Sequence, residues 1–385
     1  MKIVHTCLCG AMTDGLNYQE NIMTKYHRRM GYDVTVIASQ YVWDTQGKKG
    51  LTDKTAYQND DDVKVIRLPV RRGTVDNRLK VYPGLYKTVE AEQPDILFIH
   101  GNQFLDIITL TRYVKKHTNV RVYVDNHVDY INGAHGWLSK NILHKGLWRF
   151  CTHRIEPYVT KFYGVLPARV DFLKELYHLP EEKCELLVMG GDDERVRHAA
   201  QPQIREELRA QYGIAQEDFL IMTGGKINSY RPQTLSLLEA VGRMQREHVK
   251  LILFGSVSDE LKAKVDGMTD GKTIQNIGWV QAEDTYKYFA AADLVVFPGG
   301  HSVFWEQVAA QGIPMLVKDW EGMHHVDLGG NVRFLKESTA EEIRLAIEDL
   351  VEHPEKYRQM KAVAVEKGMK EFSYARIAER AIECE

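Results

Sequence analysis

The chain has 385 residues, of which 44% are hydrophobic and 27% are charged, and its formal net charge at pH 7 is −3. A chain of this length exceeds one ordinary hydrophobic core and suits two domains of roughly 190 residues each. The small negative charge gives no reason to expect nucleic acid as a partner. The five cysteines are scattered, which argues against a disulfide framework or a structural zinc site and favours a reducing compartment.

The N-terminal apolar run is interrupted by His5 and Thr6 and is too short for a signal peptide. No stretch of about eighteen apolar residues occurs, so no membrane-spanning helix is expected. We therefore expect a cytoplasmic protein whose only membrane contact would be peripheral, at the inner face of the membrane.

Short apolar segments alternate with helical segments through the first half of the chain. Helices are expected at residues 106–116 and at residues 18–30, where apolar side chains recur every four residues from Tyr18 to Met30. The expected strands are nearly continuously apolar, at residues 2–8, 33–38, 63–68, 95–100, 120–125 and 161–166. Such strands, separated by helices, predict a parallel sheet that is covered on both faces.

The second half repeats this pattern and becomes purely helical after Leu335. Strands are expected at residues 219–223, 249–255, 273–278, 294–298, 314–318 and 332–335, and helices at 231–245, 258–268, 283–291 and 302–311. The joint is expected at residues 189–193, between a domain of residues 1–190 and one of residues 191–369. The predicted fold class is α/β, with two Rossmann-like, doubly wound domains facing each other across a cleft. Ligands in such folds bind beyond the carboxyl ends of the strands.

Two glycines and two cations follow the first expected strand of the second half. Gly224 and Gly225 allow a tight turn, and Lys226 and Arg231 stand five positions apart at the start of the next helix. Cations beside the free amides of a helix N-terminus suit a phosphate or pyrophosphate. The alternative is that both are ordinary solvated surface cations.

A second glycine-bearing loop follows the strand expected at residues 294–298. Gly299 and Gly300 let a ligand approach the backbone, His301 is a candidate contact for a phosphate or sugar hydroxyl, and Ser302 is the expected N-cap of the next helix. Glu306 stands among apolar side chains, where a carboxylate is costly unless it is paired or binds a ligand such as a ribose diol. The alternatives are an idle loop histidine and a solvated glutamate on the helix surface.

In the first half, the turn around Gly15 bears glycine but contains no G-x-G-x-x-G, which counts against a dinucleotide-dependent dehydrogenase. His127 and His100 each follow the end of an expected strand and are candidate cleft residues. The alternative for each is a loop histidine that is hydrogen-bonded to the backbone. His324 and His325 do not predict a metal, because zinc needs three or four ligands and adjacent histidines normally point to different sides.

Together these residues resemble the GT-B fold of retaining nucleotide-sugar glycosyltransferases, in particular the large family numbered four. The resemblance covers nearly the whole chain and is strongest from Thr223 to Asp327. The family's phosphate-binding cations fall on Lys226 and Arg231, with the two types exchanged. Residues 290–298 and 306–314 are similar to the stretches around its paired-glutamate motif, but the first glutamate, eight residues before Glu306, is Pro298 here.

The resemblance implies a hexosyltransferase that moves a sugar from a UDP- or GDP-sugar to a glycan or lipid-linked acceptor in bacterial polysaccharide biosynthesis. It implies retention of the anomeric configuration, with no metal and no cofactor, and stabilisation of the leaving pyrophosphate by Lys226 and Arg231. Gly15 would contact the donor phosphate, His127 would lie near the transferred sugar, and Glu306 would bind the ribose. Backbone amides of residues 300–302 would replace the missing first glutamate. A final helix, at about residues 370–385, would cross back to the acceptor-binding N-terminal domain.

Two other functions are compatible with the same fold. A nucleotide-sugar 2-epimerase would need several carboxylates in the cleft for acid–base chemistry, and few stand at the strand ends. A non-catalytic nucleotide-sugar-binding protein is the other alternative, because Pro298 replaces the first glutamate.

Two stretches of the first half, residues 71–87 and 140–154, interleave basic and aromatic residues. They suggest contact with anionic lipid. The alternative is a solvated helix face whose aromatic side chains lie in the core.

Overall fold

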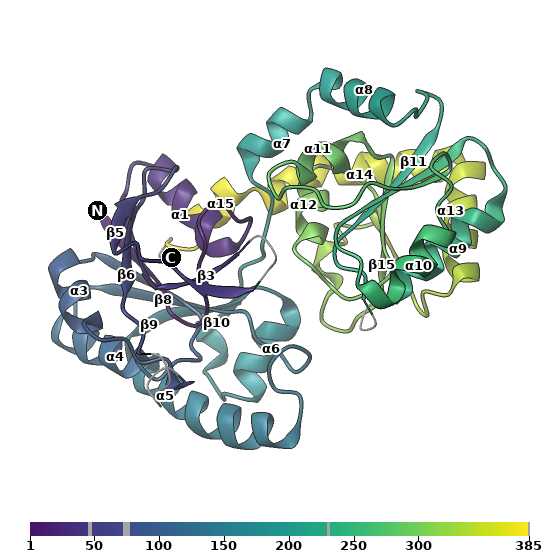
Figure 1. Ribbon diagram of the computed structural model, residues 1–385. Helices are drawn as coiled ribbons and strands as arrows, with labels where there is room; N and C mark the ends of the chain where they lie inside the picture. Colours follow the sequence, from purple (N-terminus) through teal and green to yellow (C-terminus); the bar gives the residue numbers. More distant parts are fainter. Residues whose placement is uncertain (45–47, 72–77, 229–231, 384–385) are drawn as a thin grey trace. The chain divides into compact units, whose positions relative to one another are not determined.

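The computed structural model describes residues 1–44, 48–71, 78–228 and 232–383 (Figure 1). The chain divides into two compact units. Unit 1 contains Met1–Val188 and Ile377–Glu385, and unit 2 contains Met189–Arg376. The chain therefore leaves unit 1 after Val188 and returns to it at Ile377.

Unit 1 is built on an eight-stranded sheet in the order β10-β9-β8-β7-β1-β2-β6-β5. Its neighbouring strands are parallel except for β5, which pairs antiparallel with β6 at the edge. The strands are β1 (Lys2–Cys7), β2 (Asp33–Ser39), β5 (Ala56–Gln58), β6 (Lys64–Leu68), β7 (Ile96–His100), β8 (Arg121–Asn126), β9 (Val159–Gly164) and β10 (Cys184–Leu186). A separate hairpin pairs β3 (Tyr41–Trp43) with β4 (Lys49–Leu51).

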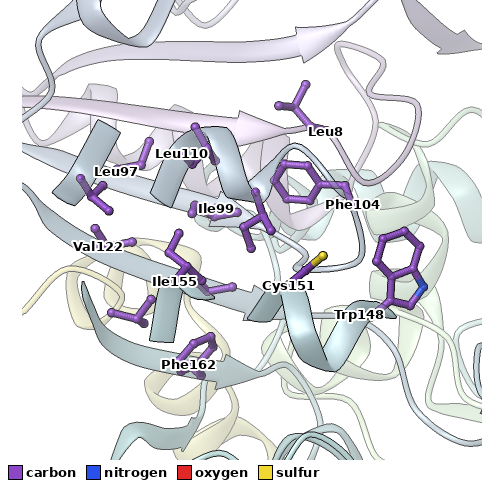
Figure 2. Packing of buried hydrophobic residues seen from close by; sticks show 14 of the residues in the cluster. Leu8, Leu97, Ile99, Phe104, Leu110, Val122, Trp148, Cys151, Ile155 and Phe162 are labelled. Atoms are coloured by element: carbon purple, nitrogen blue, oxygen red, sulfur yellow. The ribbon is translucent and has the colours of Figure 1, made fainter. Parts of the chain in front are cut away.

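Helices cover both faces of this sheet. They are α1 (Gln19–Arg29), α3 (Leu85–Glu92), α4 (Ile107–Lys116), the π-helix η1 (Ser139–Trp148), α5 (Arg149–Ile155), α6 (Pro167–Glu175) and the short η2 (Glu156–Tyr158) and η3 (Glu181–Lys183). One face packs against α3, α4 and α5; Figure 2 shows Leu97, Ile99 and Val122 of the sheet together with Leu110 and Ile155 of these helices.

The opposite face of the sheet meets α1 and the end of the chain. Tyr123 of β8 donates its hydroxyl hydrogen to the Ile382 carbonyl at 3.2 Å, and Tyr163 of β9 donates to the Arg380 carbonyl at 3.4 Å. These bonds fix the last helix, α15 (Tyr374–Arg380), against unit 1. The predicted parallel sheet with two covered faces is confirmed for this unit.

Unit 2 has a six-stranded, wholly parallel sheet in the order β13-β12-β11-β14-β15-β16. Its strands are β11 (Phe219–Gly224), β12 (Val249–Phe254), β13 (Ile274–Asn276), β14 (Leu294–Phe297), β15 (Met315–Lys318) and β16 (Val332–Leu335). The described helices are α7 (Asp193–Ala199), α8 (Pro202–Gln211), α9 (Gln233–Met244), α10 (Asp259–Gly267), α11 (Thr285–Ala291), α12 (Phe304–Ala310), η4 (His324–Val326), α13 (Ala340–Glu352) and α14 (Pro354–Phe372). The buried apolar faces of α9 and α13 pack on the sheet in one cluster. The predicted class, two Rossmann-like α/β sheets, is confirmed.

The structure corrects three details of the sequence analysis. The strand expected at residues 161–166 is Val159–Gly164, because Val165 and Leu166, although buried, already lead into α6 at Pro167. The short strands β3, β4 and β5 were not expected. Ser302 is not the N-cap of α12: the helix begins at Phe304 after Val303, and no side chain caps it.

Among the described residues, no helix is both long enough and apolar enough to cross a bilayer.

Candidate functional site

A pocket in unit 2 lies where β11, β12 and β14 end. Its walls come from the loop after β11, the loop after β14 and the starts of α9 and α12: Thr223, Gly224, Gly225, Lys226, Ile227, Thr234, Phe254, Phe297, Pro298, Gly299, Gly300, Ser302 and Phe304. Parallel strands place their carboxyl ends at one edge, which is why loops far apart in sequence meet here. The structure thus brings together Gly225, Lys226, Gly299, Gly300 and Ser302 from the predicted set.

The glycines on the β11 side of the pocket occupy positions where a side chain would clash with a neighbour or require an unfavourable backbone conformation. Gly225 and Gly255 have φ values of +127° and +125°, which L side chains rarely adopt. A Cβ on Gly255 would stand 2.0 Å from the carbonyl oxygen of Gly225, and one on Gly224 would stand 2.4 Å from the Phe254 ring. The two turns therefore pack backbone against backbone, and Gly255 holds the loop that carries Lys226.

Aromatic rings form an apolar wall beside this loop. The ring centroids of Phe254 and Phe304 lie 6.0 Å apart in an edge-on arrangement, and Phe297 and Phe304 stack at 6.4 Å. Lys226 is solvent-exposed at the same pocket. The pocket thus offers a flat apolar surface, glycine backbone and a cation. Arg231, the second predicted cation, lies outside the described residues.

Glu306, on α12 two residues after the pocket residue Phe304, is completely buried and is paired with two histidines. Its Oε1 lies 2.8 Å from His301 Nε2 and 2.7 Å from His325 Nε2, while its Oε2 has no hydrogen-bond partner among the described residues. Burial raises the pKa of Glu306, but the charges and hydrogen bonds of the two histidines outweigh it and hold this pKa well below its ordinary value. The alternative of a solvated helix-surface glutamate is wrong.

This pairing involves Glu306 and His301, two residues that were predicted to contact the ligand. The His301 side chain is 6% exposed and points to Glu306, and neither residue lines the pocket. Their predicted contacts with phosphate, sugar and ribose stay predictions. His324 and His325 do point to different partners, because His324 Nε2 lies 2.6 Å from Asp319 Oδ1.

Sequence reasoning considered His325 only as a metal ligand and missed its pairing with Glu306. Its signal was available, because Glu306 follows β14 and His325 follows the adjacent parallel strand β15, so their loops meet at one edge of the sheet.

In unit 1, the predicted residues Gly15 and His127 follow β1 and β8. Gly15 has a φ of +79°, in the left-handed region, within the turn that leads to α1. His127 is 35% exposed, and its Nε2 lies 3.2 Å from Oδ2 of the fully buried Asp125. The same Oδ2 lies 2.7 Å from His100 Nδ1. Burial lowers the pKa of His127, but the Asp125 carboxylate raises it more, and the net shift is upward.

Two groups of described residues have ligand atoms within 4.8 Å of one another, the spacing that a metal ion needs: His100, Asp125 and His127, and His301, Glu306 and His325. In each group one carboxylate oxygen already contacts both histidines, so each group is joined as a hydrogen-bonded network, while Glu306 Oε2 and His325 Nδ1 have no partner among the described residues. The expectation of no metal at either place stays a prediction.

Comparison with known proteins identifies the family. Residues 218–353, which contain the pocket, match the family "Glycosyl transferases group 1", and residues 17–187 match the family "Glycosyl transferase 4-like domain". The chain is a glycosyltransferase. No curated protein matches the glycosyltransferase in sequence.

Solved structures show that this glycosyltransferase has the GT-B fold. A glycosyltransferase of Rickettsia africae aligns with a TM-score of 0.70 at 14% identity over 98% of this chain and 96% of its own. HepE of Anabaena, solved with UDP and glucose, aligns with a TM-score of 0.66 at 14% identity over 99% and 98% of the two chains. A UDP-N-acetylglucosamine 2-epimerase shares the fold, with a TM-score of 0.61 at 14% identity over 100% and 94%.

Proposed function

We propose that this glycosyltransferase transfers a sugar from a nucleotide diphosphate sugar to a glycan or lipid-linked acceptor, with retention of configuration and without a metal. The observation that carries the proposal is the unit 2 pocket, which combines Lys226, glycine backbone and an aromatic wall. The proposed donor is a UDP- or GDP-sugar, and the structure of the Anabaena protein with UDP and glucose supports the UDP-sugar.

In the proposed complex, the diphosphate lies at the loop after β11. Lys226 neutralises its charge, and Arg231 supplies the second cation of the same segment. The base packs against the aromatic wall, because a flat ring and an apolar surface exclude water from each other. Backbone amides of Gly300, His301 and Ser302 hold the donor sugar in place of the missing first glutamate, and Gly15 contacts the donor phosphate.

The proposed chemistry needs no nucleophile from the protein. The acceptor hydroxyl attacks the anomeric carbon from the face that the diphosphate leaves, and the departing phosphate oxygen accepts the hydroxyl proton. The protein then contributes positioning and stabilisation of the charge on the leaving group. Lys226 and Arg231 serve the second task.

His127 is proposed to contact the transferred sugar. Its Nε2 faces the Asp125 carboxylate at 3.2 Å, so Nε2 carries a proton and Nδ1 is left for a sugar hydroxyl.

Glu306 has a second role beside its proposed contact with the ribose. Through His301 it ties the loop after β14 to α12, and through His325 it ties α12 to η4. We infer that this network fixes the orientation of the amides at residues 300–302, which this loop needs because no first glutamate supports the donor sugar.

The experiment that tests the proposed function is incubation of the full chain with a panel of UDP-, GDP- and ADP-sugars, followed by separation of the products. Transfer to an added glycan, or slow hydrolysis of one donor, supports the proposal. Isomerisation of the sugar would make the protein an epimerase, and binding without turnover would make it a nucleotide-sugar-binding protein; either result contradicts the proposal.

One surface of unit 1 fits a lipid-linked acceptor at a membrane. Within the described residues, six large apolar side chains between residues 131 and 150 are exposed: Ile131, Trp137, Leu138, Ile142, Leu143 and Phe150. Four basic residues, Lys140, Lys145, Arg149 and Arg154, stand in the same segment, and the sequence has no Asp or Glu from 131 to 155. We call this segment the η1 surface.

The η1 surface combines the two features that hold a protein on an anionic bilayer, apolar insertion and positive charge. We infer that it rests on anionic lipid beside the acceptor. Trp148 and His144, which the sequence placed in the same stretch, are buried and belong to the core instead. In the other stretch, Tyr82 is buried too, and Arg72 lies outside the described residues.

A further inference from the structure

Three buried histidines of unit 1 form one continuous hydrogen-bonded chain, which we call the histidine chain. His100 Nε2 lies 2.9 Å from His5 Nδ1, and His5 Nε2 lies 2.9 Å from His27 Nδ1. Both ends of the chain stop at an acceptor. His100 Nδ1 lies 2.7 Å from Asp125 Oδ2, and His27 Nε2 lies 2.7 Å from the carbonyl oxygen of Ala378.

Sheet geometry explains why these side chains meet. His5 of β1 pairs in register with Phe98 of β7, and His100 of β7 pairs with Asp125 of β8. Because side chains alternate across a strand, Phe98 and His100 point to the same face as their partners. This is the face that α1 and α15 cover, and α1 supplies His27. The three rings are at most 6% exposed.

The number of protons in the histidine chain follows from its hydrogen bonds. Four bonds join three imidazoles to two terminal groups, the Asp125 carboxylate and a carbonyl, that can only accept. Each of the four bonds needs one proton, but three neutral imidazoles supply only three. The fourth proton makes one of the three rings an imidazolium; without it, two lone pairs would face each other in a buried contact.

The position of the extra proton follows from the charges nearby. Burial lowers the pKa of His27 to about 4, and burial together with the two neighbouring histidines lowers the pKa of His5 well below its ordinary value. Within the part of the chain that the structure describes, His100 alone of the three contacts a carboxylate. Burial raises the pKa of Asp125, but His127 and His100 outweigh it and hold this pKa well below its ordinary value. His100 is therefore the imidazolium, and His5 and His27 are neutral.

We propose that His100 is an imidazolium stabilised by the histidine chain, and that His5, His27 and His100 are positioning residues that hold Asp125 ionised and oriented toward His127. The proton count depends only on the hydrogen bonds and not on the proposed function, whereas the link to catalysis rests on the proposed role of His127. Asp125 is fixed from two sides: Oδ2 contacts His100 and His127, and Oδ1 accepts a hydrogen bond from the Gly101 amide at 2.8 Å.

The proposal makes His127 sensitive to a residue that it does not touch. The positive charge on His100 competes with His127 for the Asp125 carboxylate. Replacing His27 by Phe removes one ring and the terminal carbonyl from the chain, leaving two bonds for two neutral rings, so the extra proton is no longer needed. Its loss leaves His127 as the only cationic partner of Asp125, and His127 then titrates at higher pH. Glu20 and Arg169, the other charged groups that act on His127, stay unchanged.

The test is imidazole nitrogen NMR of the full chain labelled with ¹⁵N-histidine, with His5, His27, His100 and His127 assigned by single substitutions. The spectra are recorded at pH 7.5, about one unit above the ordinary histidine pKa, where an ordinary histidine is mostly neutral. At this pH we expect both nitrogens of His100 to be protonated. His5 and His27 should be neutral, each with its proton on Nε2. A neutral His100 in the unchanged protein would overturn the proposal, and this readout needs no variant to fold.

The second readout is the titration midpoint of His127 in three variants. In His27→Phe it should move to higher pH. In His27→Gln it should stay in place, because the amide donates to Ala378 and accepts from His5 as the ring does. In Ile22→Val, a matched change in the core of α1, it should also stay. An unmoved midpoint in His27→Phe, or an equal shift in Ile22→Val, overturns the proposal. Neither readout involves a donor, so failure of the proposed function would show separately, in the donor assay.

Discussion

Lys226 is the cation among the described residues that line the unit 2 pocket, and it is exposed. A cation that stabilises a leaving diphosphate acts mainly in the transition state, so its removal lowers the rate more than it weakens binding. We predict that Lys226→Ala lowers turnover on the order of 10²–10³-fold, by analogy with the loss of an oxyanion-site donor, and that Arg231→Ala does the same.

The measurement is the rate of donor hydrolysis or transfer, with circular dichroism to show that the fold survives. Lys264→Ala is the matched control, because Lys264 is an exposed lysine on α10 of the same unit. Turnover retained in both Lys226→Ala and Arg231→Ala would refute the assignment.

Glu306 gives a residue-scale prediction about stability and pH. Its folded-state pKa is depressed, so its contribution to the free energy of unfolding is fully present above the unfolded value, about 4.3, and is lost as the pH falls toward the folded value. Glu306→Gln should lower the free energy of unfolding by about 1–3 kcal/mol at neutral pH, and the difference from the unchanged protein should shrink below about pH 4.

Urea denaturation at several pH values measures this difference. Glu366→Gln, at an exposed position of α14, is the control and should change little at any pH. A Glu306→Gln difference that is constant from neutral to acid pH would show that Glu306 is not held as a carboxylate.

At the scale of elements, the turn at Gly255 holds the loop of Lys226. Gly255→Ala would place a Cβ 2.0 Å from the Gly225 carbonyl oxygen in a conformation that L residues rarely adopt. We predict a loss of more than about 1 kcal/mol in the free energy of unfolding and weaker nucleotide binding, because the loop must move. Gly267→Ala is the control, since a Cβ there meets no atom within 4 Å. Equal stability and equal UDP affinity for both variants would contradict this account.

The η1 surface gives the second prediction at this scale. The full chain should float with vesicles that contain anionic lipid at low salt, and Trp137→Ser with Leu138→Ser should reduce the bound fraction, because these side chains are 70% and 66% exposed. Trp279→Ser is the control; this tryptophan is 64% exposed in unit 2. Absence of vesicle binding by the unchanged chain at low salt removes the membrane proposal.

Most elements could be predicted because their signals are local. The apolar runs of β1 and β7, and the four-residue spacing along α1, depend only on neighbouring residues. The edge strand β5 and the hairpin of β3 and β4 could not, because they are three residues long and only partly buried. Ser302 failed as a cap because the first i→i−4 bond of α12 runs from the Gln307 amide to the Val303 carbonyl, which makes Val303 the N-cap residue.

At the scale of the whole molecule, the sequence located the edge of the unit 2 sheet where the pocket lies, but not the partners of its charged residues. Gly225, Lys226, Gly299 and Gly300 each follow a strand, and that position alone predicted their meeting. The pairing of Glu306 with His325, and that of His5 with His27 and His100, depends on tertiary structure. In the sequence His5 only interrupts an apolar run, and its partners are 22 and 95 positions away.

A thermal-shift titration with UDP, GDP and ADP tests whether a nucleotide diphosphate binds in the unit 2 pocket. A ligand that binds the folded state and not the unfolded state raises the melting temperature, and the rise grows with the ratio of free ligand concentration to Kd. We predict that UDP or GDP raises it for the unchanged protein and for Lys264→Ala, and that the rise is largely lost in Lys226→Ala. No rise with any of the three nucleotides, or an undiminished rise in Lys226→Ala, would contradict the account.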